Sequence, residues 1–195
     1  MARKLPRFLS LPEVEAMFRA SADNPRDNLM LKCMFYLGLR NSEVQNLRVE
    51  DIDFVNENVK VVQGKGKKDR YVPIPLKSFA SELRSYIGER RTGKVFFVSD
   101  RHIRRIVKKY AEKAGIRKPE EVHPHTLRHS YATFLQNQGT PLNVIQELLG
   151  HARIDTTTIY VHLGMEKKKE LVARAFGDQK TASLRTYFSP KEGHV

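Results

Sequence analysis

The segment HPHTLRH, residues 123–129, holds side chains whose types and spacing could do chemistry. His125 and His129 are four residues apart, so a helix would place them on one face, as it does with a pair of metal ligands. Arg128 weighs against a metal site because its cation would lie beside the ion, and the segment offers no carboxylate or cysteine as a further ligand. His125 and Arg128 instead suit a phosphate, since a guanidinium can donate two parallel hydrogen bonds to that group. The remaining alternative is that the histidines only cap and fill the start of a helix.

Four residues elsewhere in the chain could take part in the same phosphate chemistry. Arg40 lies at the start of a short predicted helix, where backbone N–H groups also attract anions. Lys65 lies between two glycines at the tip of a predicted β-hairpin and could reach into a groove. His151 follows a glycine that ends a predicted helix, and Tyr160 comes nine residues later. A tyrosine phenol, with a pKa of about 10, needs neighbouring cations or a base before it can attack a phosphorus centre.

The composition of the chain fits a globular protein with a polyanionic partner. Its 195 residues include 35 Lys+Arg and 22 Asp+Glu, which gives a formal net charge of +13. The single cysteine, Cys33, excludes an internal disulfide and a cysteine-rich zinc site, and it fits a reducing compartment. No apolar run approaches the roughly 20 residues of a membrane span, and the amino-terminal residues lack the apolar region of a secretory signal. We therefore expect a cytoplasmic protein.

The elements that must position these residues are expected to be mostly helices. Ser10 and Glu13 form a capping box that predicts a helix to about Ala20. Alternating β-branched segments with turn-forming residues between them predict a three-stranded antiparallel meander over residues 52–55, 58–63 and 70–74. The other predicted helices cover residues 28–37, 42–47, 76–90, 100–114, 126–138, 140–150 and 166–176, with one more capped by Asp155. The expected fold class is thus mainly α (α+β), with one small sheet.

Four segments of the chain follow one another in the order of a known family. They are LGLRNSEVQNLRVEDID, GKGKKDRYVPIP, HPHTLRHSYATFLQNQG and IQELLGHARIDTTTIYVHL. Together they resemble the catalytic domain of the tyrosine recombinase (phage integrase) family, and they are most similar to Xer-type recombinases of the archaeal kind. The resemblance implies a catalytic domain over residues 10–176, a basic arm over 1–9 and a polar tail over 177–195. The family's amino-terminal core-binding domain is expected to be absent, either because the chain is truncated or because it is a natural single-domain form.

The resemblance assigns a role to each residue that could act on phosphate. The matching catalytic residues are Arg40, Lys65, His125, Arg128, His151 and the nucleophile Tyr160. Glu43 matches the acidic residue that orients the first arginine. The arginines would neutralise the phosphate, the histidines would hydrogen-bond it, and Lys65 would protonate the leaving 5′-oxygen. Tyr160 would then carry the cut strand as a 3′-phosphotyrosine, so neither a metal ion nor another cofactor is expected.

The resemblance also implies site-specific cleavage and rejoining of double-stranded DNA, as in chromosome-dimer resolution or the integration of mobile elements. Two other functions stay open: nicking and closing like that of a topoisomerase, and a catalytically idle DNA-binding accessory or regulator. Basic residues outside the catalytic set are expected to contact the DNA backbone. They are Lys67, Lys68, Arg70, Arg101, Arg104, Arg105 and Lys108.

Two carboxyl-terminal segments are expected to bind partners. The amphipathic stretch 166–176 is expected to dock on a neighbouring protomer, within a homotetramer on synapsed DNA. In the tail, Leu184, Tyr187 and Phe188 would form one apolar helical face, which needs a partner. Their spacing resembles a motif that binds sliding clamps, although Thr181 stands where that motif has glutamine. The alternatives are docking on the chain's own fold or a sister protomer, and disorder. In the cell the protein would be associated with the nucleoid.

Overall fold

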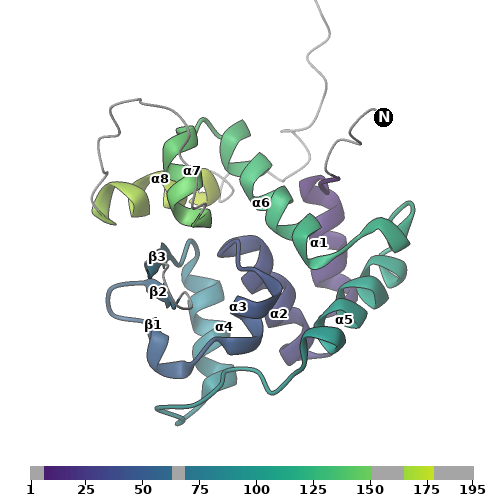
Figure 1. Ribbon diagram of the computed structural model, residues 1–195, viewed down its shortest axis with the longest axis horizontal. Coiled ribbons are helices and arrows are strands. Elements are labelled where there is room, and N and C mark those ends of the chain that lie inside the picture. Colours follow the sequence, from purple (N-terminus) through teal and green to yellow (C-terminus); the bar gives the residue numbers. More distant parts are fainter. Residues whose placement is uncertain (1–6, 63–68, 151–164, 178–195) are drawn as a thin grey trace, which may run out of the picture.

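The computed structural model describes residues 7–62, 69–150 and 165–177, which form eight α-helices, two 3-10 helices and one three-stranded sheet (Figure 1). The helices are α1 (Leu11–Ala20), α2 (Pro25–Tyr36), α3 (Asn41–Asn46), η1 (Val49–Asp51), α4 (Lys77–Ile87), α5 (Asp100–Lys113), η2 (Pro119–Glu121), α6 (Pro124–Asn137), α7 (Leu142–Leu149) and α8 (Met165–Gly177). The strands are β1 (Ile52–Asp53), β2 (Asn58–Val61) and β3 (Arg70–Pro73). The expected mainly helical fold with a small antiparallel sheet is confirmed. No described helix combines the length and the apolar character needed to cross a bilayer.

Helix α2 is the centre of the fold. It packs against α1, α3, α4, α5 and α6, and nearly every side chain from Leu29 to Phe35 is buried. An apolar run without a polar face is what a helix surrounded by other helices requires. The helix begins at Pro25, three residues before the expected start, because the Asn24 side chain accepts a hydrogen bond from the Asp27 N–H at 3.0 Å and caps the first turn.

Helix α6 also begins earlier than expected, and this start places two of the predicted site residues. The Thr126 hydroxyl accepts a hydrogen bond from the His123 N–H at 3.0 Å, and Pro124 occupies the first helical position. The helix therefore starts at Pro124 rather than at residue 126. His125 consequently lies in the first turn, and Arg128 lies one turn further along the helix.

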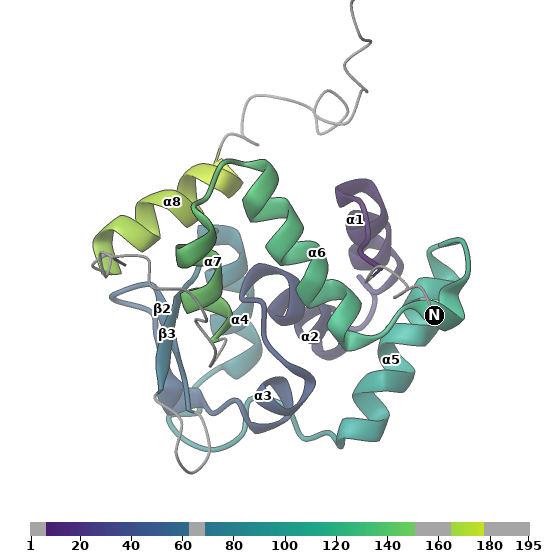
Figure 2. The same ribbon diagram turned by 45° about the horizontal axis from the view of Figure 1, so that its top comes forward.

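The sheet has the strand order β1–β2–β3, with both neighbouring pairs antiparallel. Strand β1 ends at Asp53, before the expected residue 55, because the Asp53 carboxylate accepts hydrogen bonds from the N–H groups of Val55 and Asn56 and starts a turn. Helices α7 and α8 pack against β3, so the sheet lies beside the carboxyl-terminal helices (Figure 2). Strand β3 follows residues 63–68 in the sequence and contacts the end of α7, where Arg70 donates to the Leu148 carbonyl.

Helix α8 packs on the core of its own chain. Phe176 is only 1% exposed, and its ring contacts Phe134 and Phe35 with centroid distances of 4.8 Å and 6.2 Å. Val172, one turn earlier, is also buried. This packing corrects the expectation that the apolar side chains of residues 166–176 dock on a neighbouring protomer. The hydrophobic face that would dock is already removed from water within the chain.

Candidate active site

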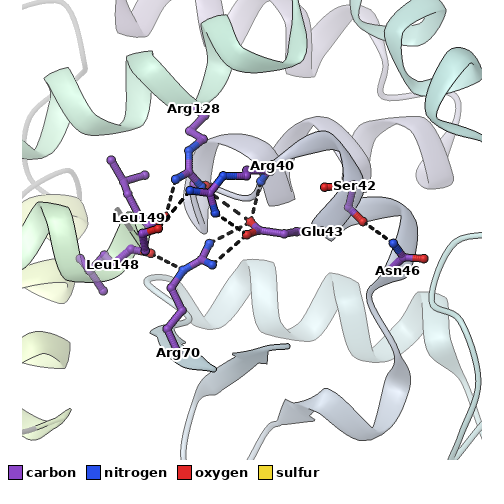
Figure 3. A network of polar contacts seen from close by, with 10 residues as sticks. Arg40, Ser42, Glu43, Asn46, Arg70, Arg128, Leu148 and Leu149 are labelled. Carbon is purple, nitrogen blue, oxygen red and sulfur yellow. Dashed lines mark hydrogen bonds and ion pairs between the residues drawn. The ribbon is translucent and has the colours of Figure 1, made fainter. Parts of the chain in front are cut away.

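One carboxylate, Glu43, gathers three arginines that come from three different elements (Figure 3). Arg40 immediately precedes α3, Arg70 begins β3, and Arg128 belongs to α6. Glu43 Oε1 accepts hydrogen bonds from Nη1 of Arg40 and Nη1 of Arg70, both at 2.8 Å. Nη1 of Arg128 lies 3.7 Å from Glu43 Oε2. The structure thus brings together Arg40, Glu43 and Arg128 of the predicted site and adds Arg70 to them.

The position of Arg40 follows from the start of α3. Glu43 Oε2 accepts the backbone N–H of Arg40 at 2.7 Å, so the same carboxylate caps the helix and holds the Arg40 side chain. Arg40 Nη2 also donates to the carbonyl of Gly150 at 3.1 Å. The Arg40 side chain is 30% exposed, compared with 8% for Arg70 and 6% for Arg128. Arg40 is therefore the arginine of this cluster that a ligand can reach most directly from solvent.

Arg70 is buried in the cluster, which corrects the prediction that it contacts the DNA backbone. Its Nη1 and Nη2 each donate to one oxygen of Glu43 at 2.8 Å, and its Nε donates to the carbonyl of Leu148 at 2.7 Å. Each nitrogen of the guanidinium is therefore bonded inside the chain. The alternation of side chains along a strand predicts this burial. Arg70 lies on the same face of β3 as the buried Val72, whereas Tyr71 between them is exposed.

Arg128 enters the cluster from α6. Its Nη1 donates to the carbonyl of Gly38 and its Nη2 to the carbonyl of Leu149, so it joins the loop before Arg40 to the end of α7. Gly38 has a positive φ of +59°, and a Cβ there would lie 2.6 Å from Cδ1 of Tyr131, a residue of α6. Only glycine therefore lets this loop come close enough for its carbonyl to accept a hydrogen bond from Arg128.

Replacing Gly38 by alanine is expected to lower the free energy of unfolding by about 2–4 kcal/mol, from left-handed strain and from overlap with the Tyr131 ring. Gly115→Ala is the matched control. Gly115 has a φ of +69°, but no atom lies within 4 Å of the Cβ position, so this variant carries the strain alone. Urea unfolding of both variants gives the difference. Equal losses would show that the close approach to Tyr131 contributes nothing.

Three successive carbonyl oxygens at the end of α7 accept hydrogen bonds from the three arginines, and Figure 3 shows those of Leu148 and Leu149. The pairs are Leu148 with Arg70, Leu149 with Arg128, and Gly150 with Arg40. The last carbonyls of a helix have no partner within the helix and form the negative end of its dipole, so cations stabilise them. These bonds attach the end of α7 to the cluster. The next residue in the sequence, His151, is one of the predicted site residues.

The cluster holds more positive than negative charge. Burial alone would raise the pKa of Glu43, but the hydrogen bonds and charge of Arg70 and the hydrogen bonds from Arg40 lower it to about 2. Burial, followed by the charge of Arg40, lowers the pKa of Arg128, although a guanidinium stays protonated at neutral pH. Three guanidiniums and one carboxylate give a formal charge of 3 − 1 = +2. A phosphate would balance this excess with charge-assisted hydrogen bonds.

His125 lies three residues before Arg128 on α6, and it is exposed to solvent. Burial of part of the ring and the charge of Arg128 lower the pKa of His125, with smaller contributions that include Arg40 and Arg104. The shift favours the neutral imidazole, which can donate one hydrogen bond and accept another. This position beside Arg128 suits a group that binds the same anion as the arginines and takes up a proton.

A second group of cations lies on one face of α5. Its members, exposed and spaced three or four residues apart, are Arg101, Arg104, Arg105 and Lys108. Arg104 pairs with Asp100 of the same helix at 2.7 Å. In the part of the chain that the structure describes, Arg101 and Arg105 form no ion pair. The start of α5 lies beside the start of α3, because the Asn41 side chain, next to Arg40 in the sequence, donates to the Asp100 carbonyl at 3.3 Å.

Several predicted site residues lie outside the described residues. They are Lys65, Lys67, Lys68, His151 and Tyr160, together with Leu184, Tyr187 and Phe188 of the tail and the helix expected after Asp155. Two residues of the cluster lie close in sequence to these segments: Gly150 immediately precedes residue 151, and Arg70 is two residues after residue 68. Within residues 7–62, 69–150 and 165–177, no three histidine, cysteine or carboxylate side chains gather as a metal site requires.

Comparison with known proteins decides which family contains this site. The sequence model of the phage integrase family matches residues 7–167. The chain belongs to the phage integrase family. A tyrosine recombinase from Pseudothermotoga lettingae is 40% identical over 177 residues, which cover 87% of this chain and 61% of that protein. Tyrosine recombinase XerA from Pyrococcus furiosus is 38% identical over 185 residues, which cover 89% of this chain and 63% of that protein.

Solved structures of this integrase family share the fold. The crystal structure of XerA recombinase superposes with a TM-score of 0.70 at 29% identity, covering 93% of this chain and 68% of that one. XerH recombinase bound to a palindromic difH substrate, in a post-cleavage complex, superposes with a TM-score of 0.64 at 28% identity. The match covers 86% of this chain and 52% of that one. The resemblance to Xer-type tyrosine recombinases is confirmed. The chain spans about three fifths of the length of the curated relatives that it matches.

Proposed function

We propose that this chain is the catalytic part of a site-specific, Xer-type DNA recombinase that cleaves and rejoins double-stranded DNA through a 3′-phosphotyrosine. The observation that carries the proposal is the cluster of three arginines around Glu43, which has a formal charge of +2 and opens to solvent at Arg40. A phosphodiester is the anion that such forked donors fit. Relatives named tyrosine recombinase XerA support the same reaction.

In the proposed reaction the Tyr160 hydroxyl oxygen attacks the scissile phosphorus, and the bond between phosphorus and the 5′-oxygen breaks. The phenol proton passes to His125 or His151, and Lys65 gives a proton to the departing 5′-oxygen. The phosphotyrosine keeps the energy of the broken ester. A free 5′-hydroxyl can therefore attack it, release Tyr160 and rejoin the strand without a nucleotide cofactor.

Arg40 and Arg128 are proposed to bind the nonbridging oxygens of the phosphate. Negative charge grows on these oxygens during attack, and donors that are already held in place stabilise it without having to reorganise. Glu43 supplies that placement for Arg40, and the carbonyls of Gly38 and Leu149 supply it for Arg128. The contacts therefore prepare the site before DNA arrives.

The cationic face of α5 is proposed to contact the DNA backbone on either side of the cleaved phosphate. Arg101, Arg104, Arg105 and Lys108 are exposed on this face. Such contacts fix the position of the duplex without reading its sequence, and they make affinity fall as the salt concentration rises. Lys67 and Lys68 are proposed to add contacts from the hairpin.

Strand exchange between two duplexes requires cleavage of both strands of each, which is why a homotetramer on synapsed DNA is proposed as the working assembly. A relative, XerH recombinase, is known in a post-cleavage complex with a palindromic difH substrate, which supports binding to DNA. Chromosome-dimer resolution and integration of a mobile element would use the same chemistry. Nicking and closing would use it without exchange of strands.

A nicked suicide duplex tests the proposed function. Cleavage of such a substrate releases a short fragment, so the 3′-phosphotyrosine cannot be rejoined and accumulates. We expect a covalent protein–DNA band on a denaturing gel. A chain that binds the duplex but forms no band on any substrate would be a DNA-binding accessory instead.

The assignment of Lys65 predicts a rescue that depends on the leaving group. Lys65→Ala is expected to form adduct about 100-fold more slowly or worse on the ordinary substrate, and close to the parent rate on a 5′-phosphorothiolate, because a thiolate leaves without a proton. Single-turnover adduct formation on both substrates measures this. Equal defects on the two substrates would assign Lys65 to phosphate binding, or would point to Lys67 or Lys68 as the acid.

A further inference from the structure

Arg70 is fully engaged in the arginine cluster, yet the proposed reaction gives it no step. We propose that Arg70 is a positioning residue for strand cleavage, which fixes the Glu43 carboxylate and the end of α7 so that Arg40 is aimed at the scissile phosphate. The inference rests on the proposed function. It gives a buried strand residue a part in the reaction without any contact to DNA.

The geometry of the Arg70–Glu43 pair supports a positioning role. Two parallel bonds of 2.8 Å join the guanidinium fork to both carboxylate oxygens, which fixes the plane of the carboxylate as well as its position. The same two oxygens hold Arg40, one through its backbone N–H and the other through Nη1. The direction of the Arg40 guanidinium therefore depends on the orientation of the carboxylate that Arg70 sets.

Arg70 also joins parts of the chain that are distant in sequence. It lies 27 residues from Glu43 and 78 residues from Leu148, whose carbonyl it binds at 2.7 Å. Leu148 lies two residues before Gly150, which binds Arg40. One side chain thus fixes β3, the start of α3 and the end of α7 relative to one another, and these are the elements next to the predicted residues Lys65, Arg40 and His151.

Charge gives Arg70 a second effect on the same site. Without the Arg70 guanidinium, the formal charge of the cluster falls from +2 to +1, and Glu43 keeps only Arg40 and Arg128 as cationic partners. The carboxylate would then compete more strongly with the phosphate for those two arginines. A neutral residue at position 70 is therefore expected to slow cleavage even when the DNA is already bound.

The test compares three variants with the parent at saturating DNA. Arg70→Gln removes the charge and the forked guanidinium. Arg70→Lys keeps the charge, but an ammonium group cannot donate to both Glu43 oxygens and the Leu148 carbonyl in the same directions. Arg105→Gln is the matched control for a DNA contact, since Arg105 is an exposed arginine on α5. The measurements are the single-turnover rate of adduct formation on the suicide duplex, the DNA dissociation constant at several salt concentrations, and the thermal midpoint of each protein.

A positioning role predicts that Arg70→Gln lowers the rate at saturating DNA by about 10–100-fold and Arg70→Lys by less, with the salt slope of DNA binding unchanged. Arg105→Gln should instead reduce the salt slope of DNA binding by about one. The inference is overturned if Arg70→Gln behaves like Arg105→Gln. It is also overturned if its rate, measured well below its thermal midpoint, equals that of the parent, since Arg70 would then serve stability alone. If Arg70→Gln does not fold, the saturated rate of Arg70→Lys decides.

The pH dependence of the rate separates positioning through Glu43 from a general packing defect. Glu43 faces Arg40, Arg70 and Arg128, and it also lines a cavity together with the charged residues Arg48, Asp51, Lys60 and Lys94. In the parent the pKa of Glu43 is about 2, so the carboxylate stays charged through the acidic range. In Arg70→Gln burial still raises that pKa, the bonds and charge of Arg70 that lower it are lost and the bonds of Arg40 remain, so the variant should begin to lose rate at a higher pH than the parent on acidification. Parallel profiles would overturn the inference.

Failure of the proposed function would look different from failure of this inference. A parent protein that forms no adduct on any duplex would disprove the recombinase chemistry for all variants alike. Arg70 can then be tested with inorganic phosphate as the probe, through the rise that phosphate produces in the thermal midpoint. Positioning predicts a smaller rise for Arg70→Gln than for the parent, and an equal rise overturns the inference without reference to cleavage.

Discussion

Replacing Tyr160 by phenylalanine is expected to reduce the covalent protein–DNA adduct below detection while DNA affinity stays within about twofold of the parent. The substitution removes one oxygen atom, and without it no bond to phosphorus can form. The arginine cluster and the cationic face of α5, which are proposed to supply most of the affinity, are unchanged. Adduct on the suicide duplex and a DNA titration at fixed salt measure the two effects separately.

Tyr71→Phe is the matched control for this experiment. Tyr71 lies on β3 next to Arg70, and its side chain is 49% exposed, so another tyrosine near the cluster loses the same atom. This control should form adduct at the parent rate. Adduct that persists in Tyr160→Phe and disappears in Tyr71→Phe would assign the nucleophile to Tyr71, and adduct that persists in both would require a nucleophile of another kind.

Most elements of the fold could be predicted from the sequence because their signals are local. Ser10 and Glu13 lie three residues apart, and the structure shows the Glu13 carboxylate accepting hydrogen bonds from both the N–H and the hydroxyl of Ser10 at 2.8 Å. The predicted starts of α2 and α6 are wrong because a polar side chain stabilises an earlier start of each helix. Asn24 starts α2 before residue 28, and Thr126 supports a start of α6 at Pro124. In each case the capping side chain lies within three residues of the boundary.

The arginine cluster shows where local patterns stop being informative. The family resemblance pairs Arg40 with Glu43, which lie three residues apart at the start of one short helix. Arg70 is among the basic residues that the sequence predicts to contact the DNA backbone, but its partners Glu43 and Leu148 lie 27 and 78 residues away. Charge patterning could not distinguish a solvated arginine from a buried one. Strand alternation could, because the β-branched Val72 on the same face marks that face as the inner one.

Arg128→Ala is expected to slow adduct formation at saturating DNA by about 10²–10³-fold, equivalent to about 2.7–4 kcal/mol of transition-state stabilisation. The guanidinium is proposed to bind a nonbridging oxygen of the phosphate, and alanine leaves no donor at that place. Stability should fall as well, by about 2–4 kcal/mol, because the buried carbonyls of Gly38 and Leu149 each lose a charged partner. Urea unfolding measures the second effect, and rates taken at temperatures where every variant is folded isolate the first.

Two further variants separate the proposed catalytic role of Arg128 from its structural one. Arg128→Lys keeps a cation but cannot donate to Gly38, Leu149 and a phosphate in the same directions, so it should recover part of the stability and only a small part of the rate. Arg19→Ala is the control, because this arginine has a 72% exposed side chain and is far from the cluster in sequence. Neither the rate of adduct formation nor the free energy of unfolding should change measurably in this variant. A rate for Arg128→Ala equal to that of the parent, in protein shown to be folded, would contradict the proposed phosphate contact. Arg128 would then act only by joining α6 to the loop at Gly38 and to the end of α7, and Arg40, which is the more exposed of the two, would bind the phosphate without it.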